Sequence, residues 1–212
     1  MTGAADGLGI ESMTEVQVAG DSDIPGVVAT LAEAFATDPV LSFLFEDPAR
    51  RPSLLAAFFA NRLAGGRGFD EVVVPADAAD GRSCAAVWVP PAEPGGPGPD
   101  FAAVGAANMA LLGEEWAVER LAPLAPMMEA HPLTPHWYLA FVGTAVSARG
   151  RGLASACISE VTRRCDAPGH GAYLESSDPA NVPLYERHGF SVTSEVTILG
   201  GPTVPLMWRD PR

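Results

Sequence analysis

The stretch "HWYLAFVGTAVSARGRGLASACISEVTRRC", residues 136–165, joins a nearly continuous apolar run to a helical pattern through a turn rich in Arg and Gly. An apolar run of this kind is typical of a central strand that is covered on both faces. After the turn, apolar residues recur at helical spacing and predict an amphipathic helix, with Leu153, Cys157, Ile158, Val161 and Cys165 on its buried face. This stretch therefore predicts a buried strand, a loop and a helix in direct succession.

The turn between the two elements has the composition of a phosphate-binding loop. Gly150 and Gly152 let backbone amides converge, and the start of the following helix adds N–H groups without partners. Arg149 and Arg151 add full positive charges. A pyrophosphate fits such a loop, but an ordinary strand-to-helix turn with solvated arginines fits these residues equally well.

Two common nucleotide-binding loops are excluded or disfavoured by the residues present. The chain contains no lysine, so all 13 basic residues are arginine. A P-loop and Schiff-base chemistry both require a lysine, and both are excluded. A dinucleotide-binding fingerprint requires a third glycine where this chain has Ser155.

Composition predicts one soluble domain. The chain has 212 residues, of which 48% are hydrophobic, and it has no apolar run of about 18 residues to cross a bilayer. Residues 1–13 lack the pattern of a secretory signal and are predicted to form a flexible tail, followed by a single domain over residues 14–212. We therefore expect a cytoplasmic protein that does not bind membranes.

Charge and cysteine content limit the partners and cofactors. The formal net charge of -13 argues against nucleic-acid binding and favours cationic ligands. Cys84, Cys157 and Cys165 show neither disulfide nor metal-ligand spacing, so they are expected to be small packing residues and no metal is expected.

The hydrophobic pattern predicts a mixed α/β fold. In chain order we expect a strand at 15–20, helices at 21–39 and 49–66, and strands at 70–76 and 83–91. A Pro- and Gly-rich loop at 90–100 precedes a helical region at 101–130, which is expected to break near Gly113. After residue 165 we expect a strand, a short helix ended by Gly189, and two more strands.

Together these motifs resemble the GNAT acetyltransferase superfamily. Its acyl-CoA loop, Gln/Arg-x-x-Gly-x-Gly/Ala, is matched by Arg149, Gly152 and Ala154. The segment "AYLESSDPANVPLYERHGF", residues 172–190, follows with the strand, Asn, Tyr and His-Gly-Phe of that family. Within the superfamily the chain resembles puromycin N-acetyltransferase and its relatives, although Val146 stands where they commonly have proline.

The resemblance implies a GNAT-like α/β fold, with a mixed, mostly antiparallel sheet of about seven strands, flanking helices and a helical insertion before the central strand. It also implies acetyl-CoA as co-substrate. The pantetheine arm would lie along the backbone of the central strand and the pyrophosphate over the loop. The expected cofactor-binding residues are Val142, Gly143, Thr144, Arg149, Gly150, Arg151, Gly152, Leu153, Ala154 and Asn181.

Two residues are expected to move protons. The resemblance implies Tyr185 as general acid for the departing thiolate, the alternative being a buried packing residue. Glu175, a carboxylate on an apolar strand, is the best named general base, although an outward-facing or Arg-paired side chain fits equally well. Asn181 is also compatible with a helix cap, and Arg163 and Arg164 with solvated positions rather than phosphate contacts.

The expected reaction is acetylation of a primary amine on a small, cationic molecule, such as an antibiotic or a biosynthetic intermediate. An apolar acceptor pocket with an acidic rim could be shaped by Phe35, Phe43, Phe45, Trp116 and Met127, although core packing is the better interpretation for most of these aromatics. The alternatives are a CoA-binding regulatory module without turnover and a protein or peptide N-acetyltransferase. A monomer and a homodimer are both compatible with the sequence.

Overall fold

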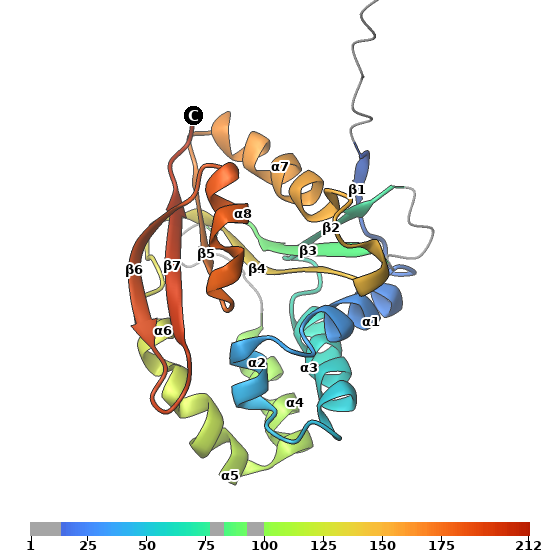
Figure 1. The fold of residues 1–212 in the computed structure, drawn as a ribbon, viewed down its shortest axis with the longest axis vertical. Helices are drawn as coiled ribbons and strands as arrows, with labels where there is room; N and C mark the ends of the chain where they lie inside the picture. The colour runs from blue at the N-terminus through green and yellow to red at the C-terminus, as the bar shows by residue number, and fades with distance from the viewer. Residues whose placement is uncertain (1–13, 77–82, 93–99) are drawn as a thin grey trace, which may run out of the picture.

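The computed structural model describes residues 14–76, 83–92 and 100–212. The predicted tail, the turn at 77–82 and most of the Pro- and Gly-rich loop lie outside the described residues. Within them a seven-stranded sheet has the order β1-β2-β3-β4-β5-β7-β6 (Figure 1). The strands are β1 (Val16–Val18), β2 (Glu71–Pro75), β3 (Cys84–Val89), β4 (His136–Thr144), β5 (Gly171–Glu175), β6 (Ser191–Thr197) and β7 (Thr203–Arg209). The predicted mixed, mostly antiparallel sheet is confirmed, because only β4 and β5 pair in parallel.

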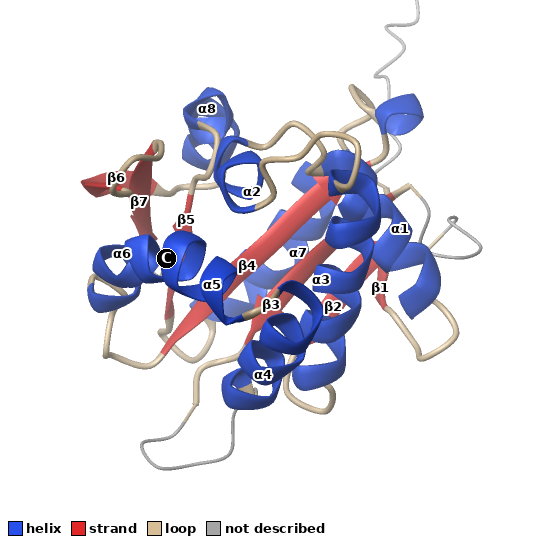
Figure 2. Ribbon diagram, turned by 90° about the horizontal axis from the view of Figure 1, so that it is seen from below, coloured by secondary structure: helices blue, strands red, loops and turns tan. Residues whose placement is uncertain are grey.

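Helices cover both faces of the sheet (Figure 2). On one face, α1 (Ile24–Ala34), α2 (Pro39–Leu44) and α3 (Arg51–Gly65) pack into one buried cluster with side chains of β2, β3 and β7. On the other face, α7 (Leu153–Asp166) and α8 (Val182–Arg187) pack into a second cluster. The apolar face predicted for α7 is confirmed, since all five of its predicted residues are buried. No helix among the described residues is long and apolar enough to cross a bilayer.

The predicted helical insertion precedes β4 and breaks where expected. It contains α4 (Phe101–Leu112), α5 (Glu114–Trp116), a π-helical turn (Ala117–Leu121), a 3-10 turn (Ala122–Leu124) and α6 (Ala125–Glu129). Gly113 separates the first two helices with a φ of 92°, a conformation that favours glycine. The insertion packs against the α1–α3 side of the molecule, where Leu112, Trp116 and Met127 contact the first cluster.

Helix α2 was not predicted from the sequence. It has only six residues, fewer than two turns, so its apolar pattern is too short to show a helical period. Its start is fixed by Asp38, whose side chain accepts a hydrogen bond from the amide of Leu41 at 2.9 Å, and by Pro39 at the first helical position. The segment after α1 is therefore a helix that turns back toward the sheet.

Strands β4 and β5 separate in the middle of the sheet. They pair only from His136 opposite Gly171 to Tyr138 opposite Tyr173, and β5 then continues along β7. In β4, Ala140 is an extra residue relative to β3, because Leu139 pairs with Trp88 and Phe141 with Val87. Such a bulge bends a strand and increases its twist. The part of β4 that follows Tyr138 therefore has no strand partner on its β5 side within the described residues.

Close packing of α1 on β4 depends on Gly143. A Cβ atom at this position would lie 2.8 Å from Cβ of Ala34 and 3.1 Å from Cδ2 of Leu31. Both contacts are shorter than packed carbon atoms tolerate, so α1 would have to move away from the strand. Gly143 is thus required by the fold as well as being a predicted cofactor-binding residue.

We predict that Gly143→Ala lowers the free energy of unfolding by about 1–3 kcal/mol, the usual cost of an overpacked core. Denaturant unfolding measures this change. Gly105→Ala in α4 is the matched control, because a Cβ there meets nothing within 4 Å. The control is expected to be neutral or stabilising by up to about 1 kcal/mol. Equal loss in both variants would show that the α1 contact is not the cause.

Candidate active site

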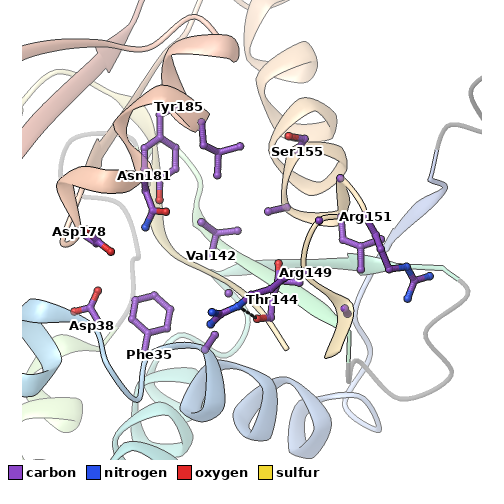
Figure 3. Close-up of a pocket in the computed structure, with 18 of the residues that line it drawn as sticks. Phe35, Asp38, Val142, Thr144, Arg149, Arg151, Ser155, Asp178, Asn181 and Tyr185 are labelled. Carbon is purple, nitrogen blue, oxygen red and sulfur yellow. Dashed lines mark hydrogen bonds between the residues drawn. The ribbon is translucent and has the colours of Figure 1, made fainter. Parts of the chain in front are cut away.

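A cleft of about 580 Å³ opens where β4 and β5 separate (Figure 3). It is lined by the end of β4, by the loop before α7, by α8 and by the chain that follows α1. All ten residues that the sequence predicts to bind the cofactor lie in its wall, as does Tyr185. The structure therefore gathers these residues around one cleft, and their individual roles remain predictions.

The loop geometry depends on two glycines. Gly150 and Gly152 have φ values of 76° and 75°, and a Cβ atom on either would meet nothing within 4 Å. They are thus required for the backbone conformation rather than for space. The hydrogen-bond ladder of α7 starts with the amide of Ala156, which donates to the carbonyl of Gly152 at 3.0 Å. The first three amides of α7 therefore have no acceptor within the helix.

The two loop arginines differ in their surroundings. Nε of Arg149 donates to the carbonyl of Thr144 at 3.4 Å, so this side chain folds back over the end of β4 (Figure 3). Arg151 is exposed at the mouth of the cleft. Arg187 of α8 adds a third guanidinium to the wall. The cleft thus combines free helix amides with three positive side chains.

Arg163 and Arg164, the other predicted phosphate candidates, pair with carboxylates instead. Arg163 forms an ion pair with Glu160, and Arg164 pairs with both Glu160 and Glu71. Arg164 also lies over the ring of Trp137, 5.6 Å from its centroid. These contacts agree with the interpretation that the pair belongs to the outer face of the helix.

Tyr185 of α8 and Asn181, at the end of the 3-10 turn that precedes this helix, face the cleft (Figure 3). Burial raises the pKa of Tyr185, and the carboxylates of Asp38 and Asp178 raise it further. The phenol therefore stays protonated at neutral pH, as a general acid requires. Asn181 occupies the N-cap position of α8 but makes no capping hydrogen bond with its side chain. The amide side chain thus remains available to a ligand in the cleft.

Asp38 is a site residue that the sequence analysis missed. Its side chain caps α2 and also accepts a hydrogen bond from the hydroxyl of Ser177, which follows β5. Burial raises the pKa of Asp38, although hydrogen bonds from Ser177 and from the backbone of α2 oppose this effect. The signal in the sequence was the Asp-Pro pair at 38–39, which marks a helix start. Its functional relevance appears only when β5 is placed beside it.

A second cavity of about 230 Å³ adjoins the first. The two share five wall residues, so they meet at one junction: Phe35, Asp38, Val142, Ser177 and Tyr185. Most of the second cavity is apolar, and Leu124, Met127 and Met128 of the insertion form part of its wall. A molecule held there would approach Tyr185 from the side opposite to the loop.

The expected acceptor-pocket residues are only partly correct. Phe35 and Met127 line the second cavity, as predicted. Phe45 and Trp116 instead line a separate surface cleft beside α3, where their rings stack with centroids 5.7 Å apart. Phe43 lies under the guanidinium of Arg120, 5.4 Å from its charged carbon. These three follow the alternative of core packing, because Phe45 belongs to the first cluster and Phe43 and Trp116 pack against it. Local sequence could not separate the two interpretations, since it does not place the insertion beside Phe43 and Phe45.

Glu175 lines the second cavity and not the first. Its side chain is 10% exposed, and Oε1 lies 3.3 Å from Nδ1 of His131. Burial, and then the Glu175 carboxylate, raise the pKa of both Tyr138 and Tyr173, which places the carboxylate beside two phenols. Glu175 is thus neither outward-facing nor paired with an arginine. Its predicted role as general base is not tested by this geometry.

Comparison with known proteins agrees with this architecture. Residues 104–190 match the model of the acetyltransferase (GNAT) family. An uncharacterized N-acetyltransferase of Schizosaccharomyces pombe (strain 972 / ATCC 24843) is 36% identical over 78 residues, which make up 35% of this chain. The match spans about a third of that relative's length, 32%.

Solved structures resemble nearly the whole chain. A Corynebacterium glutamicum ATCC 13032 structure described as histone acetyltransferase HPA2 and related acetyltransferase is 27% identical, with a TM-score of 0.70 over 93% of this chain and 96% of that one. Arylalkylamine N-acetyltransferase 2 from Aedes aegypti shares the fold at 10% identity, with a TM-score of 0.61 over 93% of this chain and 99% of that one. The fold, the family match over residues 104–190 and the loop residues gathered at the cleft are thus all similar to those of GNAT N-acetyltransferases.

Proposed function

We propose that this protein transfers an acetyl group from acetyl-CoA to the primary amine of a small molecule, by direct attack of the amine on the thioester. The observation that carries this proposal is the junction of two cavities at Tyr185 and Asp38. One cavity has the amides and guanidinium groups that bind phosphates, and the other is apolar with buried carboxylates. Donor and acceptor would therefore meet beside two groups that exchange protons.

The residues of the larger cleft fit acetyl-CoA. The free amides of α7 and the guanidinium groups of Arg149 and Arg151 suit a pyrophosphate, and Gly150 and Gly152 allow it to approach the backbone. After Tyr138, the edge of β4 that faces β5 has no strand partner within the described residues, so its backbone groups are free to form hydrogen bonds. The amides of a pantetheine arm could pair with them in the way that an added strand does. When bound there, acetyl-CoA supplies the activated acyl group.

Tyr185 would donate a proton to the departing thiolate. An ordinary phenol near pKa 10 is a weaker acid than a thiol near 8.5, so the transfer costs about 2 kcal/mol in water. Burial raises the pKa of Tyr185, and the same desolvation would raise the pKa of a thiol held beside it. A hydrogen bond from the phenol to the developing thiolate offsets part of the remaining cost.

Asp38 and Glu175 are the candidates for the group that takes the proton of the amine. Asp38 lines both cavities and so lies where donor and acceptor meet, whereas Glu175 lines only the acceptor cavity. The raised pKa of Asp38 makes it a better base than an exposed carboxylate. We therefore assign the base to Asp38, with Ser177 holding the carboxylate in place.

The acceptor is proposed to be a small amine that is cationic before it reacts. The net charge of -13 and the two carboxylates of the acceptor cavity favour a cation. Puromycin-like aminoacyl nucleosides and smaller biosynthetic amines both belong to this class. The insertion covers the cavity with Leu124, Met127 and Met128, which disfavours an extended peptide as acceptor. A module that binds CoA without turnover remains the outcome if no thiol is released.

Tyr185→Phe is expected to lower kcat by roughly a hundredfold, the range of a single general acid, and to change CoA affinity less than threefold. The assay incubates protein, acetyl-CoA and a panel of primary amines and follows free thiol; calorimetry measures CoA affinity. Phe190→Leu is the control for packing, because the ring of Phe190 packs on that of Tyr185 with centroids 6.4 Å apart. Equal losses of kcat and CoA affinity in Tyr185→Phe would point to a structural role for the phenol.

Asp38→Asn is expected to lower kcat/KM and to remove the acidic limb of its pH profile. A base works only when deprotonated, so the wild-type rate should fall as the pH falls through the pKa of Asp38, which lies above the ordinary carboxylate value. Asparagine still caps α2, which limits structural damage. Glu175→Gln is the comparison and should keep the acidic limb. Loss of that limb in Glu175→Gln alone would instead assign the base to Glu175.

Gly152→Val is expected to weaken CoA binding at least tenfold, because a branched side chain would occupy the loop that faces the pyrophosphate. Gly169→Val is the matched control: Gly169 has a φ of 73°, its Cβ would also meet nothing within 4 Å, and it follows α7 outside the cleft. Both variants carry similar backbone strain, of roughly 1–2 kcal/mol. Similar CoA affinities in the two variants would contradict the phosphate-binding loop.

A further inference from the structure

Glu175 occupies a wall of the acceptor cavity that the proposed chemistry does not use. Tyr138, Met127 and Met128 line the cavity with it, whereas Asp38 and Tyr185 lie at the junction with the larger cleft. The reacting nitrogen must lie at that junction, because only there can it reach the donor. A carboxylate away from the junction therefore contacts another part of the acceptor.

The carboxylate has hydrogen-bonding capacity to spare. Nδ1 of His131 lies 3.3 Å from Oε1, and the phenols of Tyr138 and Tyr173 also interact with the carboxylate, so at least one of its roughly four acceptor positions remains for a ligand. The side chain is 10% exposed, so water compensates little of this charge. The hydroxyl of Tyr173 is buried beside it, and although Glu175 raises the pKa of this phenol, no acceptor lies at full hydrogen-bond distance within the described residues. A donor group on a ligand would complete this polar cluster.

The titratable groups around Glu175 come from three elements. His131 follows α6, His136 and Tyr138 belong to β4, and Tyr173 belongs to β5. The rings of His136, Tyr138 and Tyr173 pack around His131 with centroids 5.1, 4.8 and 4.9 Å away. Nδ1 of His136 is occupied by the carbonyl of Thr134 at 2.6 Å. None of these groups is a fixed cation that would neutralise the carboxylate.

The rest of the cavity fits a compact apolar body. Phe35 and Phe58 each meet the ring of Phe141 edge-on, with centroids 5.8 and 6.2 Å apart. The volume of about 230 Å³ is below the range of about 300–1,000 Å³ that holds drug-sized ligands. Among the described residues in this wall none is basic, so an acceptor with its own carboxylate or phosphate would meet only negative charge.

We propose that Glu175 selects acceptors with a second hydrogen-bond donor: compact, apolar amines with a hydroxyl or a second ammonium group away from the reacting amine. This inference rests on the proposed acetyl transfer, and it makes Glu175 a specificity-determining residue. A buried carboxylate built to accept such a bond is left without it when the donor group is missing, and discrimination of roughly ten- to a hundredfold follows.

Two matched pairs of amines test the proposal. Tyramine differs from 2-phenylethylamine by one hydroxyl, and 1,5-diaminopentane differs from pentylamine by one ammonium group. The wild-type protein should have a kcat/KM at least tenfold higher for the donor-bearing member of at least one pair. A preference within the first pair indicates a neutral donor, and a preference within the second indicates a cationic donor. Glu175→Gln should reduce that ratio to below threefold. Glu195→Gln, an exposed carboxylate on β6, is the matched control and should keep it.

Calorimetric titration of each amine into the protein with bound CoA measures the corresponding ratio of binding affinities, without any turnover. Absence of thiol release together with a Glu175-dependent binding ratio would overturn the proposed activity but keep this inference. Equal kcat/KM values for both members of both pairs, or a ratio of kcat/KM values that persists in Glu175→Gln, would overturn the inference and leave the proposed acetyl transfer intact. CoA affinity and thermal unfolding report whether Glu175→Gln is folded; if it is not, Glu175→Asp, which keeps the charge but shortens its reach, should lower the ratio.

Discussion

The separation of β4 and β5 after Tyr138 and Tyr173 is the constraint on which the rest of the structure depends. A parallel pair of strands needs a crossover connection, and here the crossover is α7. Because α7 must begin where β4 ends, its free amides lie at the mouth of the gap between the strands. The glycines of the loop then let the chain turn from strand to helix without covering those amides. The proposed phosphate binding would thus follow from the route of the chain, without an additional element.

Alternation along β5 divides the molecule into a structural and a functional side. Ala172 and Leu174 belong to the cluster formed with α7, whereas Tyr173 belongs to the cluster on the opposite face. At the end of the strand, Leu174 and Glu175 reach the wall of the acceptor cavity. Ser177, two residues after Glu175, reaches Asp38 at the start of α2. A single strand therefore seals one core and supplies polar groups to the acceptor side. Burying those groups costs free energy, which is a reason to expect that a ligand uses them.

The sequence predicted which residues gather at the larger cleft, but only some of those that line the acceptor cavity, for a physical reason. The ten cofactor-binding residues lie mostly in one continuous stretch, so strand, loop and helix patterns place them together. The acceptor cavity is built from segments far apart in the chain, and the Ser177–Asp38 hydrogen bond spans 139 residues. Phe45 and Trp116 have the same apolar character as Phe35, and only tertiary packing decides which of them lines the cavity. The bulge at Ala140 likewise could not be predicted, because no glycine or proline marks it in the sequence.

Charge is sorted between the two cavities. Three arginines, Arg149, Arg151 and Arg187, line the larger cleft together with Asp38 and Asp178. The described wall of the acceptor cavity has Asp38 and Glu175 but no basic residue. In a protein with a net charge of -13, this local excess of arginine favours the binding of a polyanion in the larger cleft. In the proposed reaction, the same distribution of charge would keep an anionic donor out of the acceptor cavity and would draw a cation into it. The two substrates would then approach Tyr185 and Asp38 from opposite sides, so the electrostatics of the walls would set their orientation before any side chain moves.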